Sequence, residues 1–104
     1  MEIGDVPEKD LNIYRQEFQR GEKLFEKASE EYINTDEMHK KKQLEKVMQE
    51  TLHAMNSIIN NVLREKGTTK QKKLLDDYKN FKNDTTENTR GQITKDIEDI
   101  KKSL

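Results

Sequence analysis

An all-α fold is predicted by three features of this 104-residue sequence. Apolar residues recur at alternating steps of three and four along most of the chain, which is the spacing of one helix face. A single proline and four glycines leave few interruptions, and alternating polar and apolar runs, which would indicate strands, are scarce. We expect one domain, residues 1–104: an antiparallel helical hairpin with two shorter C-terminal helices packed on it, forming a three- to four-helix bundle with a coiled-coil-like seam.

The first helix is expected at about residues 6–33, after a disordered stretch at residues 1–5. Asp5 and Glu8 have the spacing of a capping box, in which two side chains satisfy free backbone N–H groups at a helix start. Pro7 suits a first helical turn. One apolar face then follows without a break and predicts a seam for another helix: Leu11, Tyr14, Phe18, Gly21, Phe25, Ala28 and Tyr32.

The second helix is expected at about residues 35–66, starting after a capping-box pair, Asn34 and Glu37, and ending before Gly67. Its apolar stripe is broad, combining Leu44, Met48, Thr51, Met55, Ile58 and Val62 with Val47, Leu52, Ile59 and Leu63. The run from Thr51 to Leu63 has no formal charge, although 39% of all residues are charged. We therefore expect this helix to touch more than one neighbour. Its polar outer positions are expected to be half-buried: His53, Asn56, Ser57 and Asn60.

The short turn near Asn34 predicts that these two helices run antiparallel. Counting outward from this turn places Gly21 opposite Val47 or Met48. A glycine inside a helix costs about 1 kcal/mol relative to alanine, and close approach of one of these side chains to the Gly21 backbone would explain its presence.

Two shorter helices are expected at about residues 69–82 and 85–103. Thr68 with Gln71 and Asp84 with Glu87 have capping-box spacing, although the sequence leaves open whether residues 83–91 break the last helix. The apolar residues at helical spacing are Leu74, Leu75, Tyr78, Phe81, Ile93, Ile97, Ile100 and Leu104. They are too few for this half to fold alone, so it is expected to dock on the second helix.

The core is expected to be thin. Leu, Ile, Val and Phe together number 22, close to the roughly 20% level below which chains tend to be disordered. Twenty basic residues nearly balance twenty-one acidic ones, which favours folding, because disordered chains of this polarity usually carry an excess of one sign. A thin core favours self-association or a partner that supplies apolar surface.

No catalytic, cofactor or metal site is expected. The chain has no cysteine, its serines lack a nucleophile motif, and no glycine-rich loop could hold a phosphate. Glu50 with His53 has the E-x-x-H spacing of di-iron bundles, and Asp36 with His39 repeats it. Both pairs fall on one expected helix, opposite its apolar stripe, whereas such sites need ligands from several helices at one level of a core.

Two basic clusters raise nucleic-acid binding as an alternative. Lys40–Lys42 open the second expected helix and Lys70–Lys73 open the third, so their charge could line one edge. The net charge is −1, and no aromatic residue lies among these lysines to stack on bases. Solvated helix faces are the preferred interpretation of both clusters, and nucleic acid is disfavoured as a partner.

A cytoplasmic location is expected, because the opening MEIGDVPEKD lacks the basic and apolar blocks of a signal peptide. No apolar run approaches the roughly 20 residues of a membrane span.

The function that the sequence favours is a non-enzymatic protein–protein interaction module, such as an adaptor, an assembly factor or a chaperone-like protein. It would self-associate or bind a partner protein's helix. The candidate interface residues are Leu52, Met55, Ile59, Leu63, Tyr78 and Phe81. The alternatives are a nucleic-acid accessory protein that uses the two lysine clusters and, third, a metal-binding helical bundle.

Overall fold

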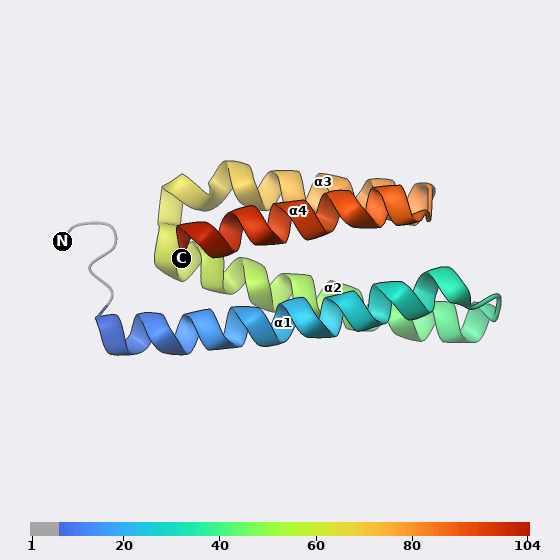
Figure 1. The fold of residues 1–104 in the computed structure, drawn as a ribbon, viewed down its shortest axis with the longest axis horizontal. Helices are drawn as coiled ribbons and strands as arrows, with labels where there is room; N and C mark the ends of the chain where they lie inside the picture. Colours follow the sequence, from blue (N-terminus) through green and yellow to red (C-terminus); the bar gives the residue numbers. More distant parts are fainter. Residues whose placement is uncertain (1–6) are drawn as a thin grey trace.

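The computed structural model describes residues 7–104, and within them the all-α prediction is confirmed (Figure 1). Helix α1 spans Glu8–Asn34 and α2 spans Met38–Leu63, followed by a short 3-10 helix, η1, at Arg64–Gly67. Helices α3 (Thr68–Asn83) and α4 (Glu87–Ser103) complete the described chain. The expected disorder of residues 1–5 and the expected cap at Asp5 lie outside the described residues.

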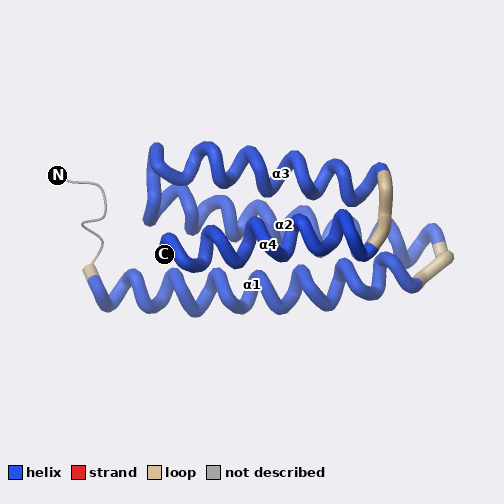
Figure 2. The backbone as a smooth tube through the Cα atoms, turned by 45° about the horizontal axis from the view of Figure 1, so that its top comes forward, coloured by secondary structure: helices blue, strands red, loops and turns tan. Residues whose placement is uncertain are grey.

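The helices run alternately up and down along the long axis of a body measuring 49 × 22 × 17 Å. Helices α1 and α2 form the longer antiparallel hairpin, and α3 and α4 form the shorter one. Helix α3 packs against α2, and α4 packs against α1. Figure 2 shows α1 and α3 on opposite sides, with α2 and α4 between them. The second hairpin therefore docks on both helices of the first, rather than on the second helix alone.

The helix starts lie within three residues of the expected ones, but the predicted caps at Asn34, Thr68 and Asp84 are wrong. An N-cap residue has non-helical backbone angles, whereas Asn34 still belongs to α1 and Thr68 has helical angles of φ −59° and ψ −47°. Asp84 closes α3 instead of opening α4. The cap of α4 is Thr86, which forms a reciprocal capping box with Thr89. The chain thus breaks between α3 and α4 at residues 84–86.

Gly21 is buried in the seam between α1 and α2, as predicted, but its neighbours differ from the predicted ones. A Cβ atom at Gly21 would lie 2.9 Å from Met55 Cγ and 3.6 Å from Thr51 Cγ2, so Val47 and Met48 are not its partners. The connection explains the shift of about one helical turn. Because α1 runs to Asn34 and a three-residue loop precedes α2, the centre of the turn lies further along the chain than expected.

A tight corner joins the two hairpins. Helix α2 ends at Leu63, and Arg64 takes a positive φ of 51°. Gly67, expected to end the second helix, instead has right-handed angles of φ −88° and ψ −8°. Its role is close approach, because a Cβ atom there would lie 2.5 Å from Ile59 Cγ2.

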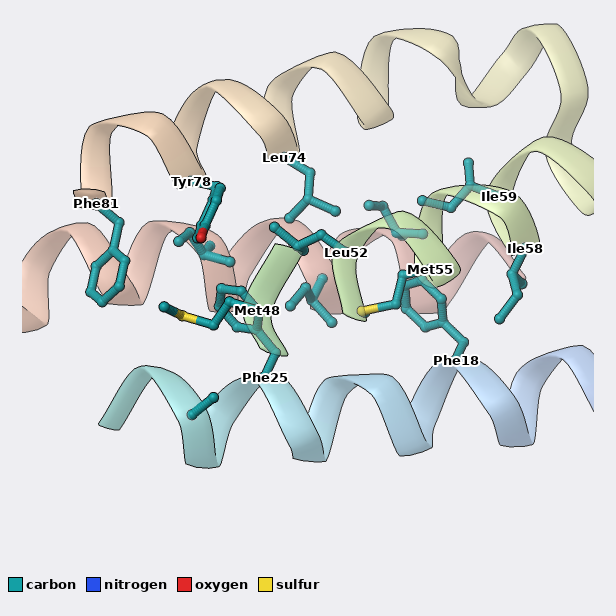
Figure 3. Packing of buried hydrophobic residues seen from close by; sticks show 14 of the residues in the cluster. Phe18, Phe25, Met48, Leu52, Met55, Ile58, Ile59, Leu74, Tyr78 and Phe81 are labelled. Carbon is teal, nitrogen blue, oxygen red and sulfur yellow. The ribbon is translucent and has the colours of Figure 1, made fainter. Parts of the chain in front are cut away.

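The core runs along the bundle axis and draws on every helix (Figure 3). Its fully buried large side chains include Phe18, Met48, Leu52, Met55, Ile59, Leu74, Phe81, Ile93, Ile97 and Ile100. Aromatic contacts link the two hairpins: the Phe25 and Tyr78 ring centroids are 6.0 Å apart, and those of Tyr32 and Phe81 are 5.7 Å apart.

The uncharged run from Thr51 to Leu63 is covered on one side only. Its buried residues are Thr51, Leu52, Met55, Ile58, Ile59 and Val62, which face the other helices. The expectation of half-buried polar positions holds for Asn56 but is wrong for His53, Ser57 and Asn60, which are exposed. The lack of charge on this outer face is therefore not explained by packing among the described residues, 7–104.

Among residues 7–104, no helix combines the length and the apolar character needed to cross a membrane.

Candidate functional site

The six candidate interface residues lie mostly in the core of the chain itself. Five of them are buried, namely Leu52, Met55, Ile59, Tyr78 and Phe81, and Leu63 is partly buried against them. Met55 forms part of the floor of a groove between α1 and α2, and Leu52 and Tyr78 line a smaller one between α2 and α3. A partner that met the folded chain would therefore contact chiefly other residues, on the rims of these grooves.

The seam between α3 and α4 is closed by ion pairs. Lys70 Nζ lies 2.6 Å from Asp99 Oδ2, and Lys73 Nζ lies 2.6 Å from Asp96 Oδ1. Asp96 is buried and also faces the carboxyl of Asp77. Burial is the main cause that raises the pKa of Asp96 to about 6, and hydrogen bonding to Asp77 acts in the same direction while Lys73 opposes it. These groups hold two helices of one chain together.

Polar contacts also close the seam between α1 and α4. Lys101 Nζ lies 2.8 Å from Oε1 of the buried Glu22. Arg90 donates from Nε to Ser29 Oγ at 2.9 Å and from a terminal nitrogen to the Glu26 carbonyl at 3.0 Å. Lys101, Glu22 and Arg90 are thus already engaged within the chain.

Helices α2 and α3 are joined by one ion pair and enclose a small groove. Lys82 Nζ lies 3.3 Å from Glu45 Oε1. The groove has a volume of about 250 Å³, and Leu75 at its edge is 40% exposed. Burial raises the pKa of Tyr78 to about 12, so its hydroxyl keeps its proton at neutral pH.

The seam between α1 and α2 differs from the others, because no ion pair crosses it among residues 7–104. On its outer side lies a groove with a volume of about 340 Å³. Gly21, Thr51 and Met55 contribute to its floor, and the half-exposed aliphatic side chains of Leu24 (49% exposed) and Val47 (41% exposed) line it from opposite helices. We call this surface the α1–α2 groove.

Three charged residues lie beside the aliphatic ones in the α1–α2 groove: Glu17 and Arg20 on α1, and Glu50 on α2. All three are exposed. Arg20 and Glu17 lie 3.6 Å apart on the same helix. The groove is thus an apolar strip with charges of both signs on its margins.

Leu24 does not stand out in the sequence, because it lies off the regular seam, directly before Phe25. Val47 was assigned to the flank of the buried stripe. The signal that could have found both is an aliphatic residue that the three-and-four spacing leaves without a partner inside the chain.

The candidate metal residues do not come together. Glu50 and His53 are both exposed on α2, and Asp36 lies in the loop before it. Within residues 7–104, no group of three or more histidine or acidic side chains could hold a metal ion.

The two lysine clusters lie at opposite ends of the bundle, since one opens α2 and the other opens α3 (Figure 1). The 26 residues of α2 separate them by about 39 Å. Lys70 and Lys73 are paired with aspartates, and the Lys41 ammonium lies 5.4 Å from the centre of the Tyr32 ring. The idea that both clusters line one edge is therefore wrong.

Comparisons with protein-family models, with curated proteins and with solved structures give no match to this chain.

Proposed function

We propose that this chain is a non-enzymatic protein–protein interaction module that works by burying the α1–α2 groove against another helical surface, either its own or a partner's. The observation that carries the proposal is the exposure of Leu24 and Val47 on either side of a seam that no ion pair crosses within residues 7–104. Adaptors, assembly factors and chaperone-like proteins work in this way. The cytoplasmic location expected from the sequence remains part of the proposal.

The shape of the groove supports the proposal. It lies between two antiparallel helices, where Gly21 lets Met55 approach α1 closely. Its volume of about 340 Å³ leaves space for side chains from outside. Helical partners bind such grooves by placing residues at i, i+3 or i+4, and i+7 along the apolar strip. Charges on the margins then select the orientation, while burial of aliphatic surface supplies most of the affinity.

The remaining faces favour this choice of surface. On the α3–α4 and α1–α4 faces, lysines and an arginine are paired with Asp96, Asp99, Glu22 and Ser29. Burying such pairs under a partner would remove water from charges already satisfied within the chain, which costs free energy. The α1–α2 groove carries a smaller cost of this kind because its centre is aliphatic.

Nucleic-acid binding gains no support from the arrangement of the lysines. Phosphate-binding surfaces depend on unpaired cations along a continuous stripe, whereas Lys70 and Lys73 are neutralised by aspartates and lie far from Lys40–Lys42.

Site-specific photo-crosslinking in cells that express the protein tests the proposal. A photoreactive amino acid at Val47 should give a covalent product with a protein, whereas the same group at Lys79, exposed on α3, should not. The mass of the product distinguishes a second copy of the chain from another partner. Equal yields at the two positions, or no product at Val47, would remove the basis of the proposed function.

A further inference from the structure

We propose that the face carrying the α1–α2 groove packs against the same face of a second copy of this chain, antiparallel, with a two-fold axis that crosses the groove midway between the levels of Arg20 and Leu24. This deepens the function proposed above and rests on it, because it names the partner of the same surface. The argument uses the size of the face, the levels of its residues and their charges.

The face is large enough for a stable dimer. The whole bundle measures 49 Å by 22 Å in its two longer directions. Helices α1 and α2, with 27 and 26 residues, span most of the 49 Å. Stable interfaces commonly bury roughly 800 Å² on each partner. Two such hairpins placed face to face would form an intermolecular layer of four helices, a usual way for amphipathic helices to pack.

The contacts of Gly21 fix the relative levels of the residues along the two helices. Gly21 lies against Thr51 and Met55, so its level corresponds to the turn between them. Because α1 and α2 are antiparallel, each step forward on α1 matches a step back on α2. Leu24 is therefore level with about Glu50, and Lys27 is level with about Val47.

A two-fold axis midway between the levels of Arg20 and Leu24 brings unlike charges together. It places Glu17 of one copy at the level of Lys27 of the second copy; the two residues are ten apart in number and about 80° apart around α1, and both are exposed. It also brings Glu50, which is level with Leu24, to the level of Arg20 of the second copy. By symmetry each pair occurs twice. Such pairs contribute little affinity but strongly favour one register.

Three other docking modes are less favourable. An axis one half-turn further along, at Leu24, places Glu17 opposite Glu31 and Arg20 near Lys27 of the second copy, so both contacts join like charges. An axis at Arg20 places this residue opposite itself. A parallel arrangement places Leu24 opposite Glu50 of the second copy and places Glu17 and Arg20 opposite the uncharged Ser57 and Ala54 of that copy. Like charges in contact disfavour a docking mode.

The antiparallel register also accounts for the uncharged outer face of α2. Helix α2 of one copy packs on α2 of the other, which places Val47 opposite about Ser57 and Glu50 opposite about Ala54. Ala54 and Ser57 are exposed in the single chain, and they are small and uncharged. Small residues at a crossing let two helix backbones approach closely, so these positions suit contact between copies.

Charge exchange tests both the dimer and its register. Sedimentation velocity of the purified full chain from about 1 to 200 μM should show concentration-dependent dimers. Glu17→Lys and Lys27→Glu should each weaken dimerisation at least tenfold, because each creates two symmetry-related contacts between like charges. The double variant Glu17→Lys with Lys27→Glu should recover to within about threefold of the original.

Recovery in the double variant can arise only between copies. Glu17 and Lys27 lie ten residues, or about 15 Å, apart on one helix and cannot pair within it, and the double variant still lacks the contact of Glu17 with Arg20. Both side chains are exposed, so circular dichroism should show unchanged helix content. Lys79→Glu on α3 is the matched control and should leave dimerisation unchanged.

The possible failures are distinguishable. A chain that stays monomeric to 200 μM overturns the dimer, and a photo-crosslink from Val47 to a different protein would then leave the proposed function standing. A dimer that ignores the single exchanges, or that the double exchange does not restore, overturns this register. A monomer without any crosslink from Val47 overturns both proposals.

Discussion

The two hairpins of this bundle are stabilised by different means. The first, α1 with α2, is long and packs through aliphatic and aromatic side chains, and within residues 7–104 no ion pair crosses its seam. The second, α3 with α4, is about two thirds as long and carries two ion pairs across its seam, one of them to a buried carboxylate. The first hairpin therefore has the larger apolar surface, while the second depends on charges and on docking.

This difference shows why the groove lies where it does. The second hairpin covers one side of the first, and its lysines and Arg90 are used to hold it there. The opposite side of the first hairpin keeps Leu24 and Val47 half-exposed, and nothing in residues 7–104 covers them. A long apolar hairpin thus has two faces to bury, and a short polar one supplies cover for only one.

The largest expected effect is loss of docking between the hairpins. Phe81 on α3 is fully buried and contacts Tyr32 on α1. Phe81→Ala should lower the free energy of unfolding by about 3–5 kcal/mol, because it removes a large side chain and leaves a cavity. Urea unfolding followed by circular dichroism measures this. Leu75→Ala, on the same helix but 40% exposed, should cost less than about 1 kcal/mol; similar losses from both would contradict the dependence on docking.

The corner between the hairpins should tolerate no side chain at Gly67. Gly67→Ala should cost about 1–3 kcal/mol, because the new methyl group meets Ile59, which is fully buried and cannot move aside. Thermal or urea unfolding measures the loss. Gly91 on α4 is the control, since no atom lies within 4 Å of a Cβ placed there. Gly91→Ala should instead stabilise the chain by up to about 1 kcal/mol.

The charged seam of the second hairpin should make stability depend on pH. The pKa of Asp96 is raised to about 6 in the folded chain, so its protonated form favours folding. This contribution is complete below the unfolded pKa of about 4 and is lost as pH rises through about 6. The free energy of unfolding of Asp96→Asn should therefore rise relative to that of the original chain by about 1–2 kcal/mol between pH 4 and pH 7, after allowance for solvent screening.

Urea midpoints of the two chains at several pH values measure this difference. Asp99→Asn provides a control of opposite sign, because Lys70 lowers the pKa of Asp99, so that its contribution is present at neutral pH and lost on acidification. A difference between Asp96→Asn and the original chain that stays constant from pH 4 to pH 7 would contradict the assignment.

The smallest expected effect is at Arg64, where the chain leaves the first hairpin. Its φ of 51° and ψ of −128° fall in a region that suits glycine rather than residues with a Cβ atom. Arg64→Gly should stabilise the chain by about 1 kcal/mol, because relief of strain outweighs the added freedom of the unfolded state. Unfolding midpoints measure it, and a loss of stability would show that the arginine side chain has a role of its own.

Much of the fold could be predicted because it depends on helical periodicity. Spacing and capping patterns located the four α-helices, though not the short 3-10 helix η1, and spacing placed Gly21 in a buried seam. The register of α1 on α2 could not be predicted, because it depends on where α1 ends and the three-residue loop begins. Asn34 could cap the second helix or end the first, and it ends the first. The docking of α4 on α1 depends on Glu22 with Lys101, which are far apart in sequence and have no distinctive spacing.

The candidate site was harder to predict than the fold. The wide stripe on α2 correctly indicated several neighbours. The residues chosen for an interface, such as Leu52 and Phe81, are however buried in the core of the chain itself. Periodicity identifies which residues are buried and does not tell an internal neighbour from an external one. Leu24 marks the outer face because it falls outside the pattern.

The end of α4 at Leu104 lies close to α1, which matters for engineering the chain. Its carbonyl accepts a hydrogen bond of 2.9 Å from Arg15 Nε, so the end of α4 is fastened beside the early turns of α1 (Figure 1). A linker of several residues would suffice to join the end of α4 to the start of α1. The chain could then be opened at the Thr35–Glu37 loop, and a circular permutant of this kind should retain the same bundle.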